Sequence, residues 1–408
     1  MYFLGLDFGT SGARAIAINR SGQIHYHHSL PYQLDRETTW QDALFGLLAQ
    51  IPRAVAARLA KVLIAATSGT VLGVDGQGHP CTPILPYFDP RASQISLPGD
   101  QGNTPASSLA KLLWLKAHYQ FTYLSHQADY LGYLLHGQVG QSDYHNCLKL
   151  GYDPVNLKFP DWITQLPVWS YLPQVSFPGR TVGRLLPSLS DRFGIAPECE
   201  ICAGTTDSTG AVLATLPELA LGVGITSLGS TLVLKLVSDR PITDLTHGIY
   251  SHRLDYQGQT FYLVGGASNT GGAVLRHFFE DKELQAYSGL IDLSQPSPYD
   301  YYPLLRPGDR FPTNDPNLLP RLEPRPEDPI AFLYGLLSSI AKIEAQGYKL
   351  LQQLTGTPIT QIYTNGGGAA NATWTKIRST YLGIIPETPV QTQAAYGAAK
   401  LALKTNPN

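Results

Sequence analysis

The sequence predicts an α/β protein built from two similar domains. The chain has 408 residues, whereas one domain usually holds ~100–200, so more than one core is expected. Short apolar runs typical of strands alternate with longer stretches that have helical apolar spacing. Residues 224–240 also repeat the pattern of residues 2–18, and Gly229 lies 220 positions after Gly9. A repeat on this scale favours two related domains over a solenoid.

The first half opens with an expected antiparallel meander. Apolar residues 2–6 and 13–18 flank a glycine turn and predict a β-hairpin, and residues 24–30 predict a third strand. This start differs from a dinucleotide-binding fold, in which the first strand leads into a helix. A helix is expected over 40–59. The apolar run 61–69 ends in small residues, which is typical of a buried strand whose end opens into a site.

Later segments follow the same logic. Residues 198–214 predict a strand, a small-residue turn that contains Asp207, and a helix. The Pro-, Asp- and Tyr-rich residues 292–329 predict a long loop. Residues 362–374 predict a strand, a glycine loop and the start of a helix. Further helices are expected at 107–118, which begins with a Ser N-terminal signal, at 329–354, and at 392–403, whose small residues predict close packing. Lys111, on the helix at 107–118, is expected to be a solvated or paired charge.

Composition excludes several function classes. The formal net charge is −2, from 29 basic and 31 acidic residues, and the sequence has no basic cluster suited to nucleic acid. A small polar ligand suits this balance, and neither a nucleic-acid nor a membrane partner is expected. No apolar run of ~18 residues, secretory signal or transit-peptide pattern is found. We therefore expect a cytoplasmic monomer or homodimer.

Four cysteines indicate a reduced chain rather than a disulfide framework. Cys199 and Cys202 form a lone C-x-x-C pair. A structural zinc site needs four ligands, and the sequence has no second close pair. Two thiols on a buried strand are therefore favoured over a metal or redox site.

Three glycine turns follow predicted strands. Hydroxyl residues accompany two of them, in Gly9-Thr10-Ser11 and Gly229-Ser230-Thr231, and the third spans 366–368. Backbone N–H groups without a neighbouring Cβ can approach phosphate oxygens closely, and hydroxyls add donors. The P-loop pattern G-x-x-x-x-G-K-[ST] is not found. The turns therefore predict a phosphate site of another type.

Two carboxylates end predicted strands, at Asp7 and Asp207. A lone aspartate at a strand end most often caps a turn. Phosphoryl transfer, however, needs a metal held against the phosphates and a base that orients the attacking hydroxyl. Two carboxylates from different strands can divide these roles, and the three glycine turns favour this interpretation. Two roles remain open for Arg14: reaching a phosphate, or pairing with surface acids.

The chain resembles the FGGY carbohydrate kinases, which belong to the superfamily of actin, hexokinase and the heat-shock chaperone ATPases. "DFGTSGARA" and "SLGSTL" are similar to the two phosphate motifs, and "NGGGAANATW" to the adenosine motif. "PYFDPRA" and "AKLLWLKAH" resemble the sugar-side W-x-D-x-R segment and K-x-x-W-L helix. "GTTDSTGA" resembles the segment that holds the catalytic base. The resemblance extends from residue 2 to about residue 403.

The resemblance implies two ribonuclease-H-like domains, 1–215 and 216–408, that flank a cleft for ATP and sugar. The first domain would carry the sugar side, the first phosphate hairpin and the catalytic aspartate. The second would carry the other phosphate hairpin and the adenosine loop.

The resemblance also assigns site residues. Asp207 would be the catalytic base, and Asp7 would help hold Mg²⁺. ATP would contact residues of the glycine turns and the adenosine motif, with Trp374 offering a flat face to the purine: Gly9, Thr10, Ser11, Arg14, Gly229, Ser230, Thr231, Gly367, Gly368, Asn371 and Trp374. The sugar would contact Asp7, Ser68, Asp89, Arg91 and Asp207, with Asp89 and Arg91 as a mutual pair.

Departures from the family pattern bear on the acceptor. Tyr87 replaces the usual Trp, and "ATSGTVLG" replaces a common G-Q-x-H-G segment, which leaves hydroxyls at Thr67, Ser68 and Thr70. A site that bonds a hydroxyl discriminates strongly against sugars that lack it. The chain resembles most the short xylulokinase-like kinases of cyanobacteria and plants, which implies D-ribulose as the preferred acceptor. The alternatives are xylulose, glycerol or another polyol, and, in a different class, a nucleotide-dependent sugar sensor without turnover.

Overall fold

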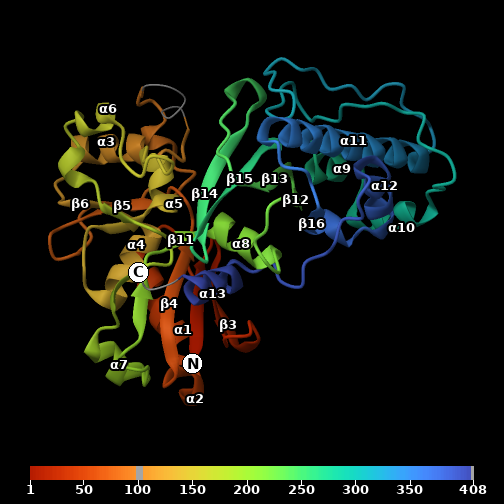
Figure 1. Cartoon of the computed structure of the whole chain (residues 1–408). Coiled ribbons are helices and arrows are strands. Elements are labelled where there is room, and N and C mark those ends of the chain that lie inside the picture. The colour runs from red at the N-terminus through yellow and green to blue at the C-terminus, as the bar shows by residue number, and fades with distance from the viewer. Residues whose placement is uncertain (98–103, 406–408) are drawn as a thin grey trace. The chain divides into compact units, whose positions relative to one another are not determined.

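The computed structural model describes residues 1–97 and 104–405, and these fall into two compact units (Figure 1). Unit 1 comprises 1–214, 255–259 and 391–408, and unit 2 comprises 215–254 and 260–390. Residues 255–259 and the C-terminal segment from 391 thus join unit 1, apart from their neighbours in the sequence.

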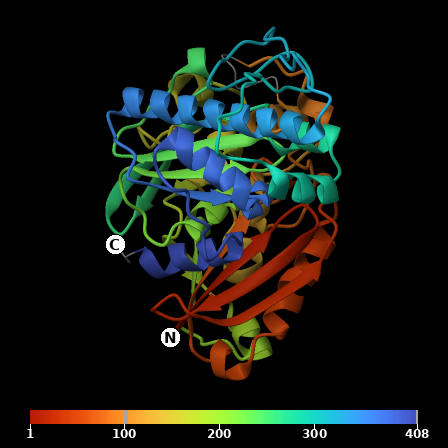
Figure 2. The same cartoon turned by 90° about the vertical axis from the view of Figure 1, so that its right-hand side faces the viewer.

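Unit 1 is built on one mixed sheet with the strand order β3-β2-β1-β4-β10-β9, and β11 also pairs with β4. The pairs β1–β2 and β2–β3 are antiparallel, whereas β4 runs parallel to β1, β10 and β11. Figure 2 shows the first three strands side by side. The strands of this sheet are β1 Tyr2–Phe8, β2 Gly12–Ile18, β3 Ile24–Pro31, β4 Leu59–Ala66, β9 Thr181–Arg184, β10 Glu200–Cys202 and β11 Thr205–Thr206.

Successive side chains of a strand point to opposite faces of its sheet. Strand β1 therefore contacts one helix on each face. Leu4 and Leu6 join a core that includes Trp40 of helix α1 (Glu37–Ala49). Gly5 faces helix α13 (Ala394–Lys404), and a Cβ at this position would lie only 1.9 Å from the carbonyl oxygen of Ala395. A glycine is therefore required for the close approach of α13, which the small-residue pattern of the predicted C-terminal helix anticipates.

A second layer of unit 1 contains the segments expected on the sugar side. Strands β5 (Val71–Val74) and β6 (Tyr123–His126) pair there, and Leu109 and Leu112 of α3 pack beside them. Ser107 caps α3 by accepting a hydrogen bond from the N–H of Ala110, as expected from the sequence. The other elements of unit 1 are α2 Arg53–Ala56, η1 Pro90–Ala92, α3 Ser108–His118, α4 Gln127–His136, β7 Gln141–Asp143, α5 Tyr144–Cys147, η3 Leu148–Leu150, α6 Asp161–Thr164, η4 Trp169–Tyr171, β8 Gln174–Ser176, α7 Pro187–Phe193 and α8 Asp207–Thr215.

Unit 2 repeats the central arrangement of unit 1. Its sheet has the order β14-β15-β13-β12-β16, in which β12 pairs antiparallel with β13 and parallel with β16. Strand β1 has the same two relations with β2 and β4, so the copied hairpin predicted from the sequence is confirmed. The strands are β12 Val223–Leu228, β13 Leu232–Ser238, β14 Tyr250–Tyr256, β15 Gln259–Ser268 and β16 Gln361–Asn365.

The core of unit 2 forms between this sheet and helix α11 (Pro329–Thr355), the long helix expected from the sequence. Leu234 and Leu236 of β13 meet Leu333 and Leu337 of α11 there. Residues 292–328 run between α10 and α11 as turns and isolated bridges, in agreement with the predicted long loop. The remaining elements are η5 Leu245–His247, α9 Gly272–Phe278, α10 Asp281–Leu290, η6 Gly367–Ala370 and α12 Ala372–Leu382.

One predicted helix is wrong in its extent. The expected helix over 40–59 ends at Ala49, and Leu59 begins strand β4. Pro52 lacks an N–H group and follows the end of α1, so the helix cannot continue through it.

Candidate functional site

The two aspartates singled out in the sequence lie at one edge of the unit 1 sheet. Asp7 pairs in register with Ala65 of β4, which in turn pairs with Thr205 of β11. Since β1, β4 and β11 run parallel, their carboxyl ends meet at the same edge, and Asp207 follows directly after β11. The fold therefore brings together carboxylates that are 200 positions apart in the chain.

Asp7 is a buried carboxylate with only part of its bonding capacity used. Its Oδ2 accepts a hydrogen bond from Nη1 of Arg14 at 3.1 Å, and the two residues are direct cross-strand neighbours. Its Oδ1 is buried and has no hydrogen-bond partner among the described residues. Burial raises the pKa of Asp7 to about 6, although Arg14 counteracts this shift, and the charge of Asp207 adds to it. Arg14 thus pairs with a buried acid, Asp7, and not with the surface acids expected as one alternative from the sequence.

Asp207 is the first residue of helix α8, where the helix dipole favours a negative charge. Its Oδ1 accepts a hydrogen bond from the N–H of Ser208 at 2.6 Å. Burial raises the pKa of Asp207 above its ordinary value, while the Ser208 N–H and the Lys149 ammonium act in the opposite direction. A carboxyl group with a raised pKa is suited to accept a proton near neutral pH.

A cavity of about 520 Å³ connects these groups within unit 1. Asp7, Gly9, Arg14 and Asp207 line it. The sequence did not identify the remaining lining residues, which come from the start of α8 and from the segment that leads into α13: Ser208, Ala211, Thr392, Gln393 and Ala394. The predicted residues Thr10 and Ser11 are exposed in the turn beside Gly9.

A chain of hydrogen bonds holds the first glycine turn against the segment after β4. Tyr32 donates its hydroxyl to the carbonyl oxygen of Gly9 and accepts a bond from Nε2 of Gln127 at 3.0 Å. The Oε1 of Gln127 in turn accepts from the hydroxyl of Thr67 at 2.7 Å. Tyr32 and Gln127 were not predicted from the sequence, since nothing in their local pattern indicates a partner 95 positions away.

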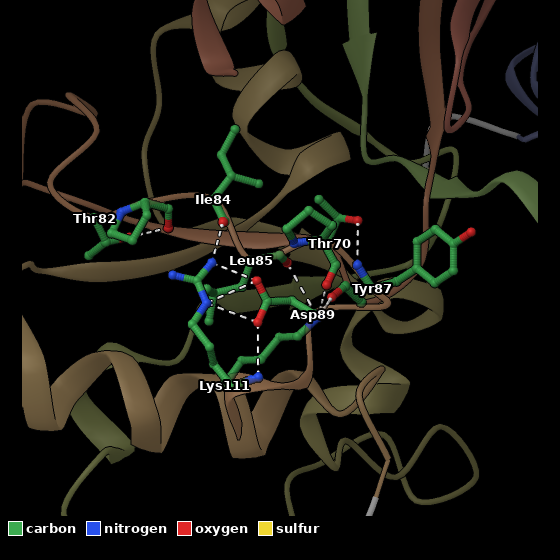
Figure 3. A network of polar contacts seen from close by, with 11 residues as sticks. Thr70, Thr82, Ile84, Leu85, Tyr87, Asp89 and Lys111 are labelled. Atoms are coloured by element: carbon green, nitrogen blue, oxygen red, sulfur yellow. Dashed lines mark hydrogen bonds and ion pairs between the residues drawn. The ribbon is translucent and has the colours of Figure 1, made fainter. Parts of the chain in front are cut away.

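The predicted sugar-side segment forms a polar network in unit 1 (Figure 3). Asp89 and Arg91 pair as expected, with Nε of Arg91 at 2.9 and 3.0 Å from the two carboxylate oxygens of Asp89. The N–H of Tyr87 donates to the Thr70 hydroxyl at 3.1 Å. This bond fixes the segment that carries Asp89 against the turn after β4.

Lys111 of α3 corrects an expectation from the sequence, which favoured a solvated or surface-paired charge. Its side chain is fully buried, and its ammonium donates to the carbonyl oxygens of Gly69, Leu85 and Pro86 at 2.7, 3.3 and 2.5 Å. Burial lowers the pKa of Lys111 to about 7, against the opposing effect of the Asp89 carboxylate. The buried ammonium joins the two turns that frame the sugar-side segment (Figure 3).

The second glycine turn lies in unit 2, between β12 and β13. The N–H of Gly229 donates to the carbonyl oxygen of Thr231 at 3.2 Å, and the carbonyl oxygen of Ser230 accepts from the N–H of Ala273 at 3.0 Å. Arg276 of α9, which the sequence analysis did not single out, donates from Nη2 to the Ser230 hydroxyl at 3.1 Å. The turn is thus bonded to the start of α9.

Unit 2 also contains a cavity of about 670 Å³, lined by Gly367, Gly368, Asn371, Trp374 and Arg276 among others. Four of the predicted adenosine residues therefore share one cavity. Asn371 caps α12 through Oδ1 and donates from Nδ2 to the Ser288 hydroxyl at 2.8 Å.

Trp374 differs from expectation, because the ring is only 2% exposed and its Nε1 donates to the carbonyl oxygen of Leu337. The ring belongs to the core of unit 2 and forms a wall of the cavity rather than an open stacking face.

The C-x-x-C pair lies in the interior of unit 1. Cys199 and Cys202 are buried free thiols, and burial raises the pKa of each to about 12. Among residues 1–97 and 104–405, no three His, Cys, Asp or Glu side chains gather in a group that could hold a metal ion. Within the same ranges, no helix has the length and apolar character needed to span a membrane.

Comparison with known proteins finds a family match in the second half of the chain and relatives along most of its length. Residues 224–405 match the C-terminal domain of the FGGY family of carbohydrate kinases. The chain is 24% identical to a gluconokinase of Bacillus subtilis, over 93% of this chain and 82% of the relative. It is 23% identical to a xylulose kinase of Staphylococcus xylosus, over 98% and 90% of the two chains.

Solved structures extend the similarity to the complete fold. The crystal structure of a "xyloylose kinase" from Brucella ovis has a TM-score of 0.84 and 20% identity, over 99% of this chain and 90% of that one. A Plasmodium falciparum glycerol kinase solved with ADP has a TM-score of 0.81 at 13% identity, over 98% and 88%. At these identities the likeness concerns the fold. Residues 224–405 thus carry the C-terminal domain of the FGGY family of carbohydrate kinases, and the chain as a whole is similar in sequence to proteins named gluconokinase and xylulose kinase and similar in fold to solved sugar kinases.

Proposed function

We propose that the protein transfers the γ-phosphoryl group of ATP to the terminal hydroxyl of a ketopentose, with D-ribulose as the preferred acceptor. The observation that carries the proposal is the cavity that Asp7 and Asp207 line together at one sheet edge of unit 1. In this assignment Asp207 accepts the proton of the sugar hydroxyl as that oxygen attacks phosphorus. The glycine turns and the unit 2 cavity bind the nucleotide.

Asp7 fits the role of a magnesium-binding residue. Carboxylate oxygens are the ligands that Mg²⁺ prefers, and Asp7 Oδ1 is a buried oxygen that lacks a partner in the described structure. A bound Mg²⁺ would neutralise charge on the transferring phosphoryl group. Asp7 would hold the positive charge of Mg²⁺ near Asp207. The positive charge of the Arg14 guanidinium would partly neutralise the two carboxylates.

The acceptor assignment rests on the segment after β4. Thr67 and Thr70 bond to each other at 2.7 Å, and the Thr67 hydroxyl also reaches Gln127, so their hydroxyls shape the site rather than face solvent. Ser68 lies between them and is half-buried. Because the two threonine hydroxyls are bonded within the protein, Ser68 is the proposed sugar contact in this segment.

Relatives of the chain support other acceptors of similar chemistry. They are named gluconokinase, xylulose kinase and L-fuculokinase. We therefore test D-ribulose against D-xylulose, L-fuculose, glycerol and gluconate at fixed ATP and Mg²⁺, with coupled detection of ADP. We expect the highest kcat/KM for D-ribulose. A higher kcat/KM for another acceptor would show that this acceptor, and not D-ribulose, is the preferred substrate.

The alternative of another class is a sugar sensor that binds nucleotide without turnover. The pairing of two carboxylates in one cavity favours a transfer reaction, because a sensor needs no base for the sugar hydroxyl. ADP release that stays at background with every acceptor, from protein that still binds ATP, would favour the sensor.

A further inference from the structure

We propose that Lys149 is an acceptor-binding residue, whose ammonium lies beside Asp207 and donates a hydrogen bond to an oxygen of the sugar. This inference rests on the proposed kinase function and deepens it, since the sequence analysis gave Lys149 no role. The lysine belongs to unit 1, as do Asp207 and Ser68.

The fold holds Lys149 on a short, tightly bonded segment. Lys149 lies in η3, directly after α5. The Asp143 carboxylate caps α5 by accepting from the N–H groups of His145 and Asn146 at 2.8 and 3.0 Å. Nδ1 of His145 also lies 2.7 Å from the hydroxyl oxygen of Thr205 on β11. The element that precedes Lys149 is thus fixed to the strand that precedes Asp207.

The lysine ammonium reaches the same sheet edge as the proposed catalytic base. Its Nζ donates to the carbonyl oxygen of Ser68 at 2.9 Å. Ser68 lies two residues beyond Ala66, which pairs in register with Thr206. Since β4 and β11 are parallel neighbours, Ser68 and Asp207 both extend from their carboxyl ends. The ammonium is therefore held where the acceptor is expected.

Gly69 allows the lysine stem to take this path. Its φ of +89° lies in the left-handed region, and a Cβ there would meet the Ala106 carbonyl oxygen at 2.5 Å and Cδ of Lys149 at 3.2 Å. Any larger residue would push against the stem. The turn after β4 thus combines a backbone carbonyl that anchors the ammonium with a glycine that makes room for it.

The charges of Lys149 and Asp207 influence each other. Burial lowers the pKa of Lys149, and the Asp207 carboxylate partly reverses this shift. In return, Lys149 lowers the pKa of Asp207. This mutual effect is consistent with the position of both groups at the same sheet edge.

The ammonium has hydrogen-bonding capacity to spare. It carries three N–H donors, and the Ser68 carbonyl is its one acceptor among the described residues. Lys149 is only partly exposed, and a cation shielded from water is stabilised by further hydrogen-bond partners. A hydroxyl, carbonyl or carboxylate oxygen of the acceptor would supply such a partner, and the donor-only lysine would then help fix the sugar with its reacting hydroxyl toward Asp207.

The test replaces Lys149 with Met, which keeps the length of the stem and removes the charge and the donors. Lys116→Met is the matched control, because the Lys116 ammonium likewise donates to a backbone carbonyl, that of Pro167 at 2.7 Å, from an exposed position in unit 1. Lys149→Arg restores a cation with donors. The Kd of D-ribulose by calorimetry, kcat/KM for D-ribulose and ATP, and Tm are measured for each protein.

A hydrogen bond to a charged group contributes about 1.5–3 kcal/mol, so Lys149→Met should weaken D-ribulose binding about 10- to 100-fold. The Kd of ATP should stay within about twofold, Lys149→Arg should recover part of the loss, and Lys116→Met should behave as wild type. If the wild type phosphorylates D-ribulose and Lys149→Met, folded by its Tm, binds it equally well, Lys149 has no such role. If the wild type phosphorylates no sugar, the proposed function fails first and this inference with it.

Discussion

Asp207 and Asp7 occupy one cavity but different environments, and this difference assigns their roles. Asp7 is closed in by β2 and paired with Arg14, whereas Asp207 begins a helix and is bonded by the Ser208 N–H. Burial raises the pKa of both carboxyl groups. Two nearby carboxylates with different partners are the arrangement that separates a charge-holding residue from a proton acceptor.

Replacing Asp207 with Asn tests the proton-accepting role at nearly constant shape. General-base catalysis contributes about 10²–10⁴-fold, so kcat for the preferred sugar should fall by that factor. The Kd of ATP should stay within about twofold, because Asn keeps the shape of the side chain and Asp207 is not among the residues assigned to ATP. Asp75→Asn is the control, since Asp75 lies in unit 1 in an exposed turn with His79. An Asp207→Asn enzyme that retains a tenth or more of the wild-type kcat would remove Asp207 from the role of base.

His136 gives a prediction about stability and pH. The residue is buried at the end of α4, its Nδ1 accepts a hydrogen bond from the N–H of Gln138 at 3.1 Å, and burial lowers its pKa from 6.5 to about 4. Between pH 6.5 and 4 the unfolded chain therefore binds more protons than the folded chain, so the free energy of unfolding falls as the pH falls. The loss should reach about 3 kcal/mol.

Urea unfolding at pH 7, 5.5 and 4.5 of the wild type and of His136→Gln measures this contribution. As the pH is lowered, the free energy of unfolding should fall more steeply for the wild type than for His136→Gln. His79→Gln, at an exposed position, should follow the wild type. A pH dependence that is identical in His136→Gln and the wild type would show that His136 is not the group responsible.

At the scale of elements, a buried ion pair joins helices α11 and α12 of unit 2. Nε and Nη2 of Arg378 donate to the two oxygens of Glu344 at 2.6 and 2.7 Å, and both side chains are at most 1% exposed. Thr226 of β12 donates to the same carboxylate at 2.6 Å. The pair thus fixes α12, which begins at the proposed nucleotide cavity, to the sheet and to α11.

Breaking this ion pair should strongly destabilise the protein, because it leaves the buried Glu344 carboxylate without its partner. Arg378→Met is expected to lower the free energy of unfolding by about 3–5 kcal/mol. Arg321→Met removes an exposed pair with Asp300 and should cost less than about 1 kcal/mol. Chemical denaturation of both variants measures the contrast, and equal losses would contradict the structural role given to Arg378.

The sequence predicted best those elements whose signals are local. The hairpins around Gly9 and Gly229 were predicted correctly because a glycine turn and alternating apolar residues are read within one short window. The end of the first helix was missed, since the apolar run continues past Pro52 into β4. Lys111 was misjudged because its three carbonyl acceptors lie 25 to 42 positions away.

At the scale of the whole molecule, each unit repeats one sheet topology and puts a glycine turn after its central strand. This repeat was visible in the sequence as a spacing of 220 residues. The return of the last helix to unit 1 was not, because the small residues of α13 predict close packing but do not name the partner. The paired aspartates were expected together from their strand ends, whereas Tyr32, Gln127 and Lys149 depend on long-range contacts.

The most direct test of the account follows the labelled γ-phosphoryl group of ATP in a reaction with D-ribulose and Mg²⁺. We expect the wild type to yield ADP and a ribulose monophosphate in equal amounts, with the label on the terminal oxygen, and Asp207→Asn to yield almost none. Label released only as inorganic phosphate, or sugar phosphorylated equally well by Asp207→Asn, would contradict this expectation.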